Sequence, residues 1–239
     1  MGCVMNRFDE IAQDYDEDIY PLNEEEFVLP TVERLAELAL GKDILELAVG
    51  TGRIAIPLAE RGFNVTGIDI SEGMLWELKK KSDTVKTLVG DMRDVSISET
   101  FDLAYLIFNG ISYALTLEDQ VATLKNAARH LKTGGMLVIE TFVPRLHEIV
   151  GDNRAPFALE EDFIGFDEYD RINQTVVSHQ YDLSAGQVAS YQTEHRYVWP
   201  SELELMGKLA GLEVVARWGS WDKEALTNDS DDMIFVFQK

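Results

Sequence analysis

Residues 43–71, DILELAVGTGRIAIPLAERGFNVTGIDIS, limit the possible folds of this chain more than any other stretch. An apolar run is followed by a glycine-containing turn, a helix-forming segment and a second apolar run that ends at Asp69. This order is typical of two parallel strands joined by a crossover helix. Glycines in such a turn suit a phosphate, and the terminal acid suits a ribose. The acids near both ends, however, make a poor cradle for a phosphate.

The same alternation continues to residue 142. Apolar runs predict strands at residues 44–49, 63–70, 85–89, 101–108 and 136–142. Helices are expected at 53–61, at 71–81 with Ser71 as the N-cap, and at 117–131, before a break at Gly134-Gly135. Upstream, residues 7–40 predict two helices separated at Pro21. The order indicates an α/β fold with a doubly wound, mostly parallel sheet that helices cover on both faces.

The pattern changes after Pro144. We expect residues 145–165 to be irregular and acidic, and the following residues to alternate with period two around Ser184-Ala185-Gly186, which predicts an antiparallel β-insert. A helix should open at Pro200, and two final apolar runs predict a hairpin with a reversed last strand. The chain then divides into a helical lid (1–40), a core (41–144), an acidic loop with the β-insert on the substrate side (145–199), and a return to the core sheet (200–239).

Composition restricts the partners of this chain. Its 239 residues suit a single α/β unit with an insert, and the one cysteine, Cys3, suits a reducing, cytoplasmic location. The longest uncharged run, residues 103–117, is too short and polar for a membrane span. A net charge of −22 argues against nucleic acids and anionic membranes. Nine acids lie within residues 9–26 and indicate either a solvated surface or a mouth that attracts cations.

Three acids lie at or near the ends of neighbouring predicted strands. Glu46 lies in the first strand, Asp69 ends the second, and Asp91 follows the third, directly before Met92. A carboxylate at the end of the second strand can accept both ribose hydroxyls, and a Met beside an acid can cover an adenine whose amine the acid accepts. Such a site suits a nucleoside that carries positive charge and no phosphate. S-adenosylmethionine has those properties.

At these residues the sequence resembles the class I S-adenosylmethionine-dependent methyltransferases. The similar segments are ELAVGTG, VTGIDIS, GDMRD, FDLAYLIFNGISYAL and HLKTGGMLVIET. The N-terminal FDEIAQDYD and the β-insert resemble small-molecule N-methyltransferases, including those acting on amino-sugars and glycine. Ala48 replaces the first glycine of the family motif and Thr133 replaces the usual proline. The resemblance implies a Rossmann-like methyltransferase fold and transfer of a methyl group to a small-molecule acceptor, for which we expect an amine.

The resemblance also implies which residues bind the cofactor, and it implies no metal. Those residues are Tyr15, Glu46, Ala48 and Gly50 around the methionine, Asp69 at the ribose, Asp91 and Met92 at the adenine, Phe108 and Asn109 on the floor near the sulfonium, and Gly52, Arg53, Ile70 and Met74 beside them.

An amine must lose a proton before it can attack, so a base can assist the transfer. The candidates are Tyr113, His195, His179 and Glu140, with Tyr113 and His195 preferred, and core packing is the alternative role for each aromatic. We expect the β-insert to wall the pocket with Tyr181, Tyr191, His195 and Tyr197, and alternation places the last three on one face.

Other activities stay open at this point. A small-molecule O-methyltransferase shares every motif. A nicotinamide-dependent oxidoreductase would use the G-x-G-x-x-A spacing of residues 50–55, and a non-catalytic S-adenosylmethionine-binding protein would use the same pocket without transfer. The acceptor, the choice of nitrogen, oxygen or carbon, and the oligomeric state are not specified by the sequence.

Overall fold

The computed structural model describes residues 7–19, 25–144, 146, 149, 153–184 and 188–239. Cys3, the expected break at Pro21 and the expected turn at Ala185-Gly186 lie outside these residues. None of the helices in this part of the chain is long and apolar enough to cross a membrane.

The core alternates strands and helices, as the sequence predicts. A seven-stranded sheet has the order β10-β11-β5-β4-β1-β2-β3. Its parallel part and helices are β1 (Asp43–Leu47), α3 (Ala55–Glu60), β2 (Asn64–Asp69), α4 (Glu72–Lys81), β3 (Lys86–Val89), β4 (Phe101–Leu106), the short 3-10 helix η3 (Gly110–Tyr113), α5 (Leu117–His130) and β5 (Leu131–Phe142).

The last strand is reversed, as expected. After α6 (Pro200–Leu209), β10 (Glu213–Trp218) and β11 (Asp232–Gln238) pair antiparallel with each other, and β11 pairs antiparallel with β5. Together these elements confirm the Rossmann-like, mostly parallel sheet.

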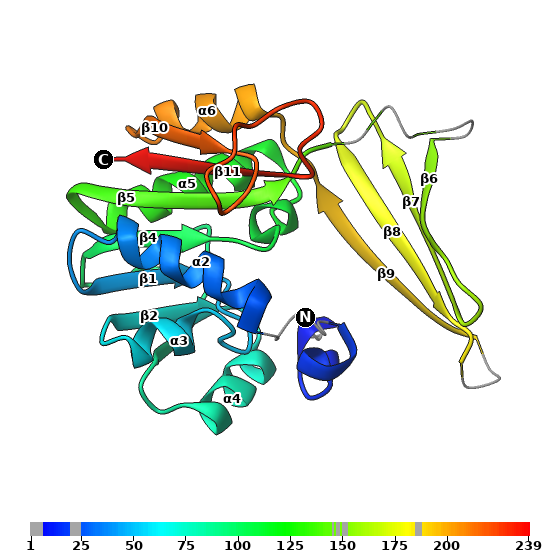
Figure 1. The fold of residues 1–239 in the computed structure, drawn as a ribbon, viewed down its shortest axis with the longest axis horizontal. Coiled ribbons are helices and arrows are strands. Elements are labelled where there is room, and N and C mark those ends of the chain that lie inside the picture. Colours follow the sequence, from blue (N-terminus) through cyan, green and yellow to red (C-terminus); the bar gives the residue numbers. More distant parts are fainter. Residues whose placement is uncertain (1–6, 20–24, 145, 147–148, 150–152, 185–187) are drawn as a thin grey trace.

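Helices cover both faces of this sheet, because each strand sends alternate residues to opposite sides. Leu45 joins a cluster with residues of α5 and α6, whereas its neighbour Ile44 joins one with residues of α2 (Glu25–Leu38), α3 and α4. Figure 1 shows α2 and α3 in front of the sheet and α5 behind it. The chain order reverses between β1 and β4, which is where ligands bind in such sheets.

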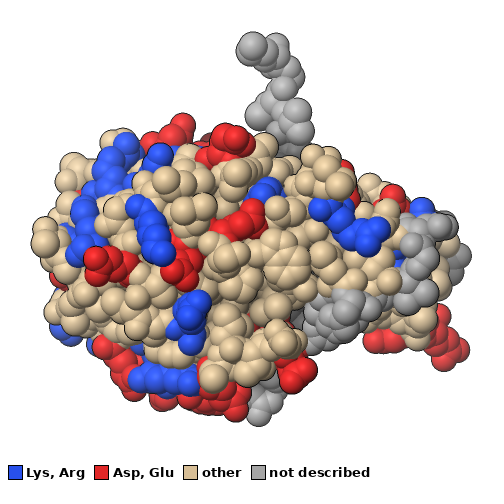
Figure 2. Space-filling view, turned by 90° about the horizontal axis from the view of Figure 1, so that it is seen from above, with Lys and Arg blue, Asp and Glu red and all other residues tan. Residues whose placement is uncertain are grey.

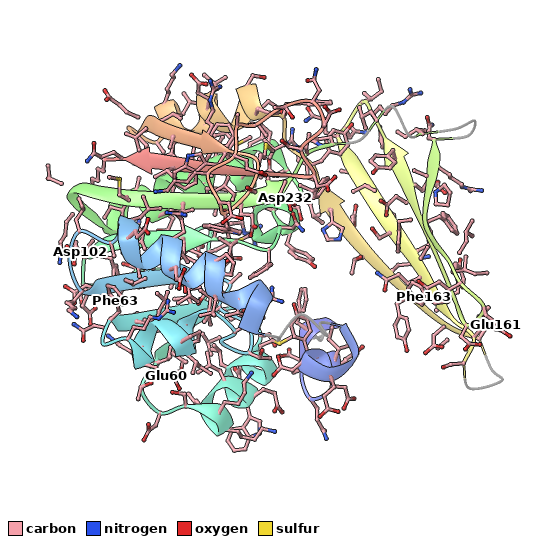
Figure 3. All side chains as sticks on the ribbon, in the orientation of Figure 1. Glu60, Phe63, Asp102, Glu161, Phe163 and Asp232 are labelled. Carbon is pink, nitrogen blue, oxygen red and sulfur yellow. The ribbon has the colours of Figure 1, made fainter. Side chains whose placement is uncertain are left out.

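The β-insert is a separate four-stranded antiparallel sheet that projects from the core (Figure 1). Its strands are β6 (Arg154–Leu159), β7 (Phe163–Asp170), β8 (Thr175–Asp182) and β9 (Ala189–Arg196). Figure 3 places Glu161 and Phe163 at its far tip and Asp232 near its junction with the core, while Asp102 and Phe63 lie at the opposite end of the core.

The expectation of irregular structure over residues 145–165 was wrong where β6 and the start of β7 lie. β6 is an edge strand, and its register shifts between Pro156 and Ala158. Proline is tolerated in sheets at edges and bulges, where no ladder hydrogen bond is lost. The proline and the acids at residues 160–162 hide the strand from a period-two pattern.

Two boundaries also differ from expectation. α5 ends at His130 and β5 begins at Leu131, because Leu131 already pairs with Phe101 ahead of the expected glycine break. The described part of the N-terminal segment is a short helix, α1 (Arg7–Ile11), followed by a π-helical turn, η1 (Tyr15–Ile19), instead of one regular helix. In Figure 1 this segment lies between the core and the β-insert.

Figure 2 shows the molecule from the side on which α6 and β10 lie in Figure 1. On this face Lys and Arg side chains are interspersed with Asp and Glu side chains. The net charge of −22 therefore does not form one uniform acidic field here.

Candidate active site

A cavity of about 320 Å³ opens at the carboxyl ends of β1, β2 and β4. Of the residues predicted to bind a cofactor or to act on an acceptor, those that line it are Tyr15, Glu46, Ala48, Gly50, Arg53, Asp69, Ile70, Met74, Asp91, Met92, Phe108 and Tyr113. Gly52, Asn109 and His195 are not among the lining residues. Phe8, from the N-terminal segment expected to form the lid, also lines it, and so do Asp16, Thr51, Arg93 and Asp119, which were not predicted from the sequence.

The loop after β1 places backbone, and little side chain, at the cavity. Ala48, Gly50 and Gly52 all have positive φ, which favours small residues. A Cβ on Gly50 would meet nothing within 4 Å, so open space lies in front of this backbone. A Cβ on Gly52 would lie 2.7 Å from the Leu78 side chain. Gly52 therefore permits packing against α4, and Gly50 is the position where a ligand can approach closely.

Asp69 joins the end of β2 to this loop. Its Oδ2 atom accepts the N–H of Gly50 at 2.8 Å, and its Oδ1 atom accepts the N–H of Ser71 at 2.9 Å. Burial raises the pKa of Asp69, although these N–H groups favour its charged form. Each carboxylate oxygen has a further lone pair, so Asp69 can still accept hydroxyl groups of a ligand.

Glu46 lies 5% exposed in the cavity wall. Its Oε2 atom accepts the O–H of Tyr105 at 2.7 Å. Burial, together with the nearby charge of Asp69, raises the pKa of Glu46 to about 8, and the Tyr105 hydrogen bond and Arg53 oppose the shift. A cationic ligand beside Glu46 would favour its ionised form.

Glu140 positions Phe108 instead of lining the cavity. It accepts the backbone N–H of Phe108 at 3.0 Å and the indole N–H of Trp221 at 2.7 Å. Burial raises its pKa to about 7. Phe108 has a positive φ, and the Arg53 guanidinium lies 3.5 Å from the centre of its ring. Glu140 is not among the lining residues, and its two oxygens accept the N–H groups of Phe108 and Trp221, so this geometry gives it a structural role and does not support it as the base.

Asn109 also differs from its predicted place on the cavity floor. Its left-handed backbone, with φ of 61°, turns the side chain toward β5, where Oδ1 accepts the N–H of Phe142 at 2.8 Å. Asp91 lies where it was expected, but Arg93 donates to both of its oxygens and holds its pKa below the usual range.

The N-terminal segment is bonded to two loops of the cavity. Oδ1 of Asp9 accepts the Ser71 hydroxyl at 2.6 Å and the Gly73 N–H at 2.9 Å. Asp16 accepts the Thr51 hydroxyl at 2.6 Å and pairs with Lys81 at 2.6 Å. Two of the nine N-terminal acids thus latch the segment to the core. We call these four contacts the aspartate latch.

Aromatic rings surround the mouth. Phe8 of the N-terminal segment packs edge-on against Tyr113, with ring centres 5.2 Å apart. The centre of the Tyr113 ring lies 4.8 Å from that of His195, which directly precedes Arg196, the last residue of β9. Tyr113 is 37% exposed. The end of the β-insert that joins the core therefore adjoins the cavity through Tyr113.

Three expectations about the β-insert were wrong. His179 and Tyr181 lie on the opposite face from His195, because Val176 pairs with His195 and strand side chains alternate. His179 instead stacks on Phe166, with ring centres 4.7 Å apart. Tyr197 follows β9 and is buried against Tyr169 and Trp199, so it walls no pocket.

The lining charges suit a cationic nucleoside. The carboxylates of Asp16, Glu46, Asp69, Asp91 and Asp119 line the cavity, against the two guanidinium groups of Arg53 and Arg93. In the part of the chain that the structure describes, no three His, Cys, Asp or Glu side chains gather as a metal ion would require. An α/β sheet with a reversed last strand and an acid-rich cavity at its switch point suits a small ligand that carries positive charge.

Comparisons with known proteins identify the family to which this chain is similar. Residues 44–135 match the methyltransferase domain family. The cypemycin N-terminal methyltransferase of Streptomyces sp is 30% identical over 205 residues, which cover 83% of this chain and 84% of that protein. The CcbJ methyltransferase structure from Streptomyces caelestis has a TM-score of 0.84 at 27% identity and 95% coverage of both chains.

A third similarity concerns the fold. The S-adenosylmethionine-bound structure of CalS10, an amino pentose methyltransferase from Micromonospora echinaspora, has a TM-score of 0.69 at 15% identity, with 100% of this chain and 98% of that chain covered. The chain belongs to the S-adenosylmethionine-dependent methyltransferases. The cofactor of this family is S-adenosylmethionine, and family membership therefore excludes the nicotinamide alternative.

Proposed function

We propose that this enzyme transfers the methyl group of S-adenosylmethionine to an amine of a small molecule. The observation that carries the choice of an amine is the similarity, over 84% of its length, to a protein named an N-terminal methyltransferase. The amino pentose methyltransferase of the same fold points the same way. The acceptor side is the β-insert together with Tyr113 and Phe8, whose aromatic rings meet at the cavity mouth.

We assign the cofactor contacts from the lining charges. Asp69 holds the ribose, Asp91 and Met92 hold the adenine, and Glu46 lies near the positive charge of the methionine end. Arg53, over the Phe108 ring, holds the carboxylate. The cofactor supplies an electrophilic methyl group whose leaving group needs no activation. The protein then contributes mainly by positioning and by excluding water.

The division of the chain is part of the proposal. Residues 1–40 act as a lid, 41–144 as the cofactor-binding core, 145–199 as the acceptor side and 200–239 as the return to the core sheet. We further propose a cytoplasmic enzyme that binds neither nucleic acids nor membranes, because one cysteine and a net charge of −22 suit that setting.

The deciding experiment is a methyl-transfer screen with labelled S-adenosylmethionine. The acceptors are matched by size and comprise glycine, sarcosine, an aminohexose, an alanine-initiated tripeptide, and phenols and acids without an amine. Transfer to at least one amine, lost when that amine is acetylated, is the expected result. Transfer confined to phenols or acids would replace the amine with an O-methyltransferase activity.

A further inference from the structure

We propose that His195 is the general base of the transfer and that Ser112 is its positioning residue, which fixes the imidazole with its proton on Nδ1 and its lone pair on Nε2. This inference rests on the proposed amine methylation. It concerns two residues on different elements, η3 of the core and β9 of the β-insert, whose side chains meet beside Tyr113, a residue that lines the cavity.

The hydrogen bonds of Ser112 determine the tautomer. Ser112 Oγ lies 2.7 Å from the carbonyl oxygen of Asn109 and 2.9 Å from Nδ1 of His195. A hydroxyl has one proton to donate. Two oxygens 2.7 Å apart without a proton between them would repel, so the Ser112 proton points to the Asn109 carbonyl. The second contact must then be a hydrogen bond from Nδ1–H of His195 to Oγ.

This tautomer suits a base. When Nδ1 carries the proton of a neutral imidazole, Nε2 carries the lone pair. The same logic orients the base in hydrolytic triads, where a third group holds one ring nitrogen so that the other can take a proton. Here a buried hydroxyl holds it: Ser112 is 0% exposed.

Gln120 of α5 fixes the distance between the two residues. Its side-chain N–H group donates to the carbonyl of Arg196 at 3.0 Å and to the carbonyl of Ile111 at 3.3 Å. These two residues directly follow His195 and directly precede Ser112. Arg196 also donates to the Oε1 atom of Gln120. The fully buried side-chain amide of Gln120 thus ties the end of β9 to η3, so the Ser112–His195 pair does not depend on exposed side chains.

The position of the ring connects it to the acceptor. His195 packs against Tyr113, and Tyr113 lines the cavity. In the transfer, the amine nitrogen forms a bond to the methyl carbon. The bond between that carbon and sulfur breaks with its electron pair staying on sulfur, and the proton lost by nitrogen goes to Nε2. Release of that proton to water restores the imidazole.

Several other titratable groups face this region, and their effects on the pH profile of the transfer must be separated from that of His195. Tyr113 comes from η3, Asp167 and Tyr169 from β7, and Tyr191 from β9, all on the side of the sheet where His195 lies. Glu46 and Glu140 have raised pKa values of about 8 and about 7 and can shape the same pH range.

The chain offers a matched control. His179 is another imidazole of the same sheet, hydrogen-bonded through Nδ1 to Gln192, but it lies on the opposite face. Asparagine can place its amide nitrogen near the Nδ1 position while it removes Nε2. His195→Asn therefore keeps a hydrogen-bond donor for Ser112 and removes the base. His179→Asn makes the same side-chain change on the opposite face of the sheet, where we expect no effect on methyl transfer.

The first test needs no acceptor. Nitrogen-15 NMR of the imidazoles, assigned by the loss of a signal in His195→Asn, reports which nitrogen carries the proton. We expect Nδ1–H for neutral His195, and a shift toward Nε2–H in Ser112→Ala. Neutral His195 with its proton on Nε2 in the wild type would overturn the proposal. Thermal unfolding and S-adenosylhomocysteine titration show that each variant is folded.

The second test uses the amines that the wild type methylates. His195→Asn should lower kcat by roughly 100-fold or more, as for loss of a general base, with S-adenosylhomocysteine affinity within about twofold and the imidazole limb of the pH profile lost. His179→Asn should match the wild type. Wild-type transfer that survives in His195→Asn overturns the base role alone, whereas absence of transfer to any amine overturns the proposed function and the base role with it.

Discussion

The Oδ2 atom of Asp69 accepts the backbone N–H of Gly50 at 2.8 Å. This contact joins the end of β2 to the loop after β1, its neighbour in the sheet. The acid expected to hold a ribose therefore also shapes the loop that would approach the cofactor. A charged acceptor makes such a hydrogen bond stronger than a neutral one.

Replacement of Asp69 should therefore weaken cofactor binding. We expect Asp69→Ala to bind S-adenosylhomocysteine at least tenfold more weakly, because hydrogen bonds to a charged group contribute about 1.5–3 kcal/mol. Isothermal titration measures the affinity. Asp43→Ala is the control: Asp43 begins β1 at the opposite end of the sheet and pairs on the surface with Lys132. Equal affinities for both variants would place the ribose elsewhere.

Glu46 should make the stability of the free enzyme depend on pH. Its pKa is about 8 in the folded protein and 4.5 as the ordinary value, so folding favours the neutral form. The stabilising contribution is fully present below pH 4.5 and is lost as the pH rises through about 8. The melting temperature should fall across this range, and less steeply in Glu46→Gln.

Two comparisons check the origin of that slope. Glu140→Gln should also flatten it, because burial raises the pKa of Glu140 to about 7 and the sign is the same. Glu99→Gln should not flatten it in this range: Glu99 is fully exposed and paired with Lys86, and its pKa is lowered. An identical slope in wild type and Glu46→Gln would show that Glu46 is ionised in the folded protein.

The aspartate latch should hold the lid on the core. We expect the double variant Asp9→Ala/Asp16→Ala to raise the KM for S-adenosylmethionine by roughly tenfold, because each lost charge-assisted contact costs about 1.5–3 kcal/mol and part of this is screened. Limited proteolysis should cut its N-terminal segment faster. Glu10→Ala/Asp14→Ala removes two exposed acids of the same segment and should behave as the wild type.

Deletion of residues 1–20 tests the lid as a whole. The truncated protein should lose turnover, because lids exclude water and complete a site, while the melting transition of the sheet core persists. Full activity after truncation would refute the lid, whatever the latch variants do.

Salt should weaken capture of a cationic acceptor. The chain carries a net charge of −22, so a cationic amine is attracted over a Debye length of about 8 Å at 0.15 M salt. We expect kcat/KM for the preferred amine to fall several-fold between about 0.05 and 0.5 M salt, while kcat stays nearly constant. An acceptor without charge serves as the control, and equal salt dependence for both would remove the electrostatic argument.

The sequence could predict the core because its signals are local. Apolar runs of strand length, Ser71 as an N-cap and the glycine loop each fix one element, and Ser71 does accept the N–H of Met74. The strand-end acids are predictable for a further reason: parallel strands end at one edge of a sheet, so Glu46, Asp69 and Asp91 had to gather there. β6 was missed because Pro156 and a register shift obscure its alternation.

What only the tertiary structure decided is the use of each polar side chain. His179 and His195 look alike in sequence, and the pairing of β8 with β9 alone sends them to opposite faces. Glu140 is a candidate base in the sequence, but in the structure it lies outside the cavity lining and accepts N–H groups of Phe108 and of Trp221, which is 81 residues away. Asn109 leaves the cavity because its left-handed backbone turns its side chain to Phe142. Register, distant partners and backbone handedness are set by packing across the whole chain, and no local pattern contains them.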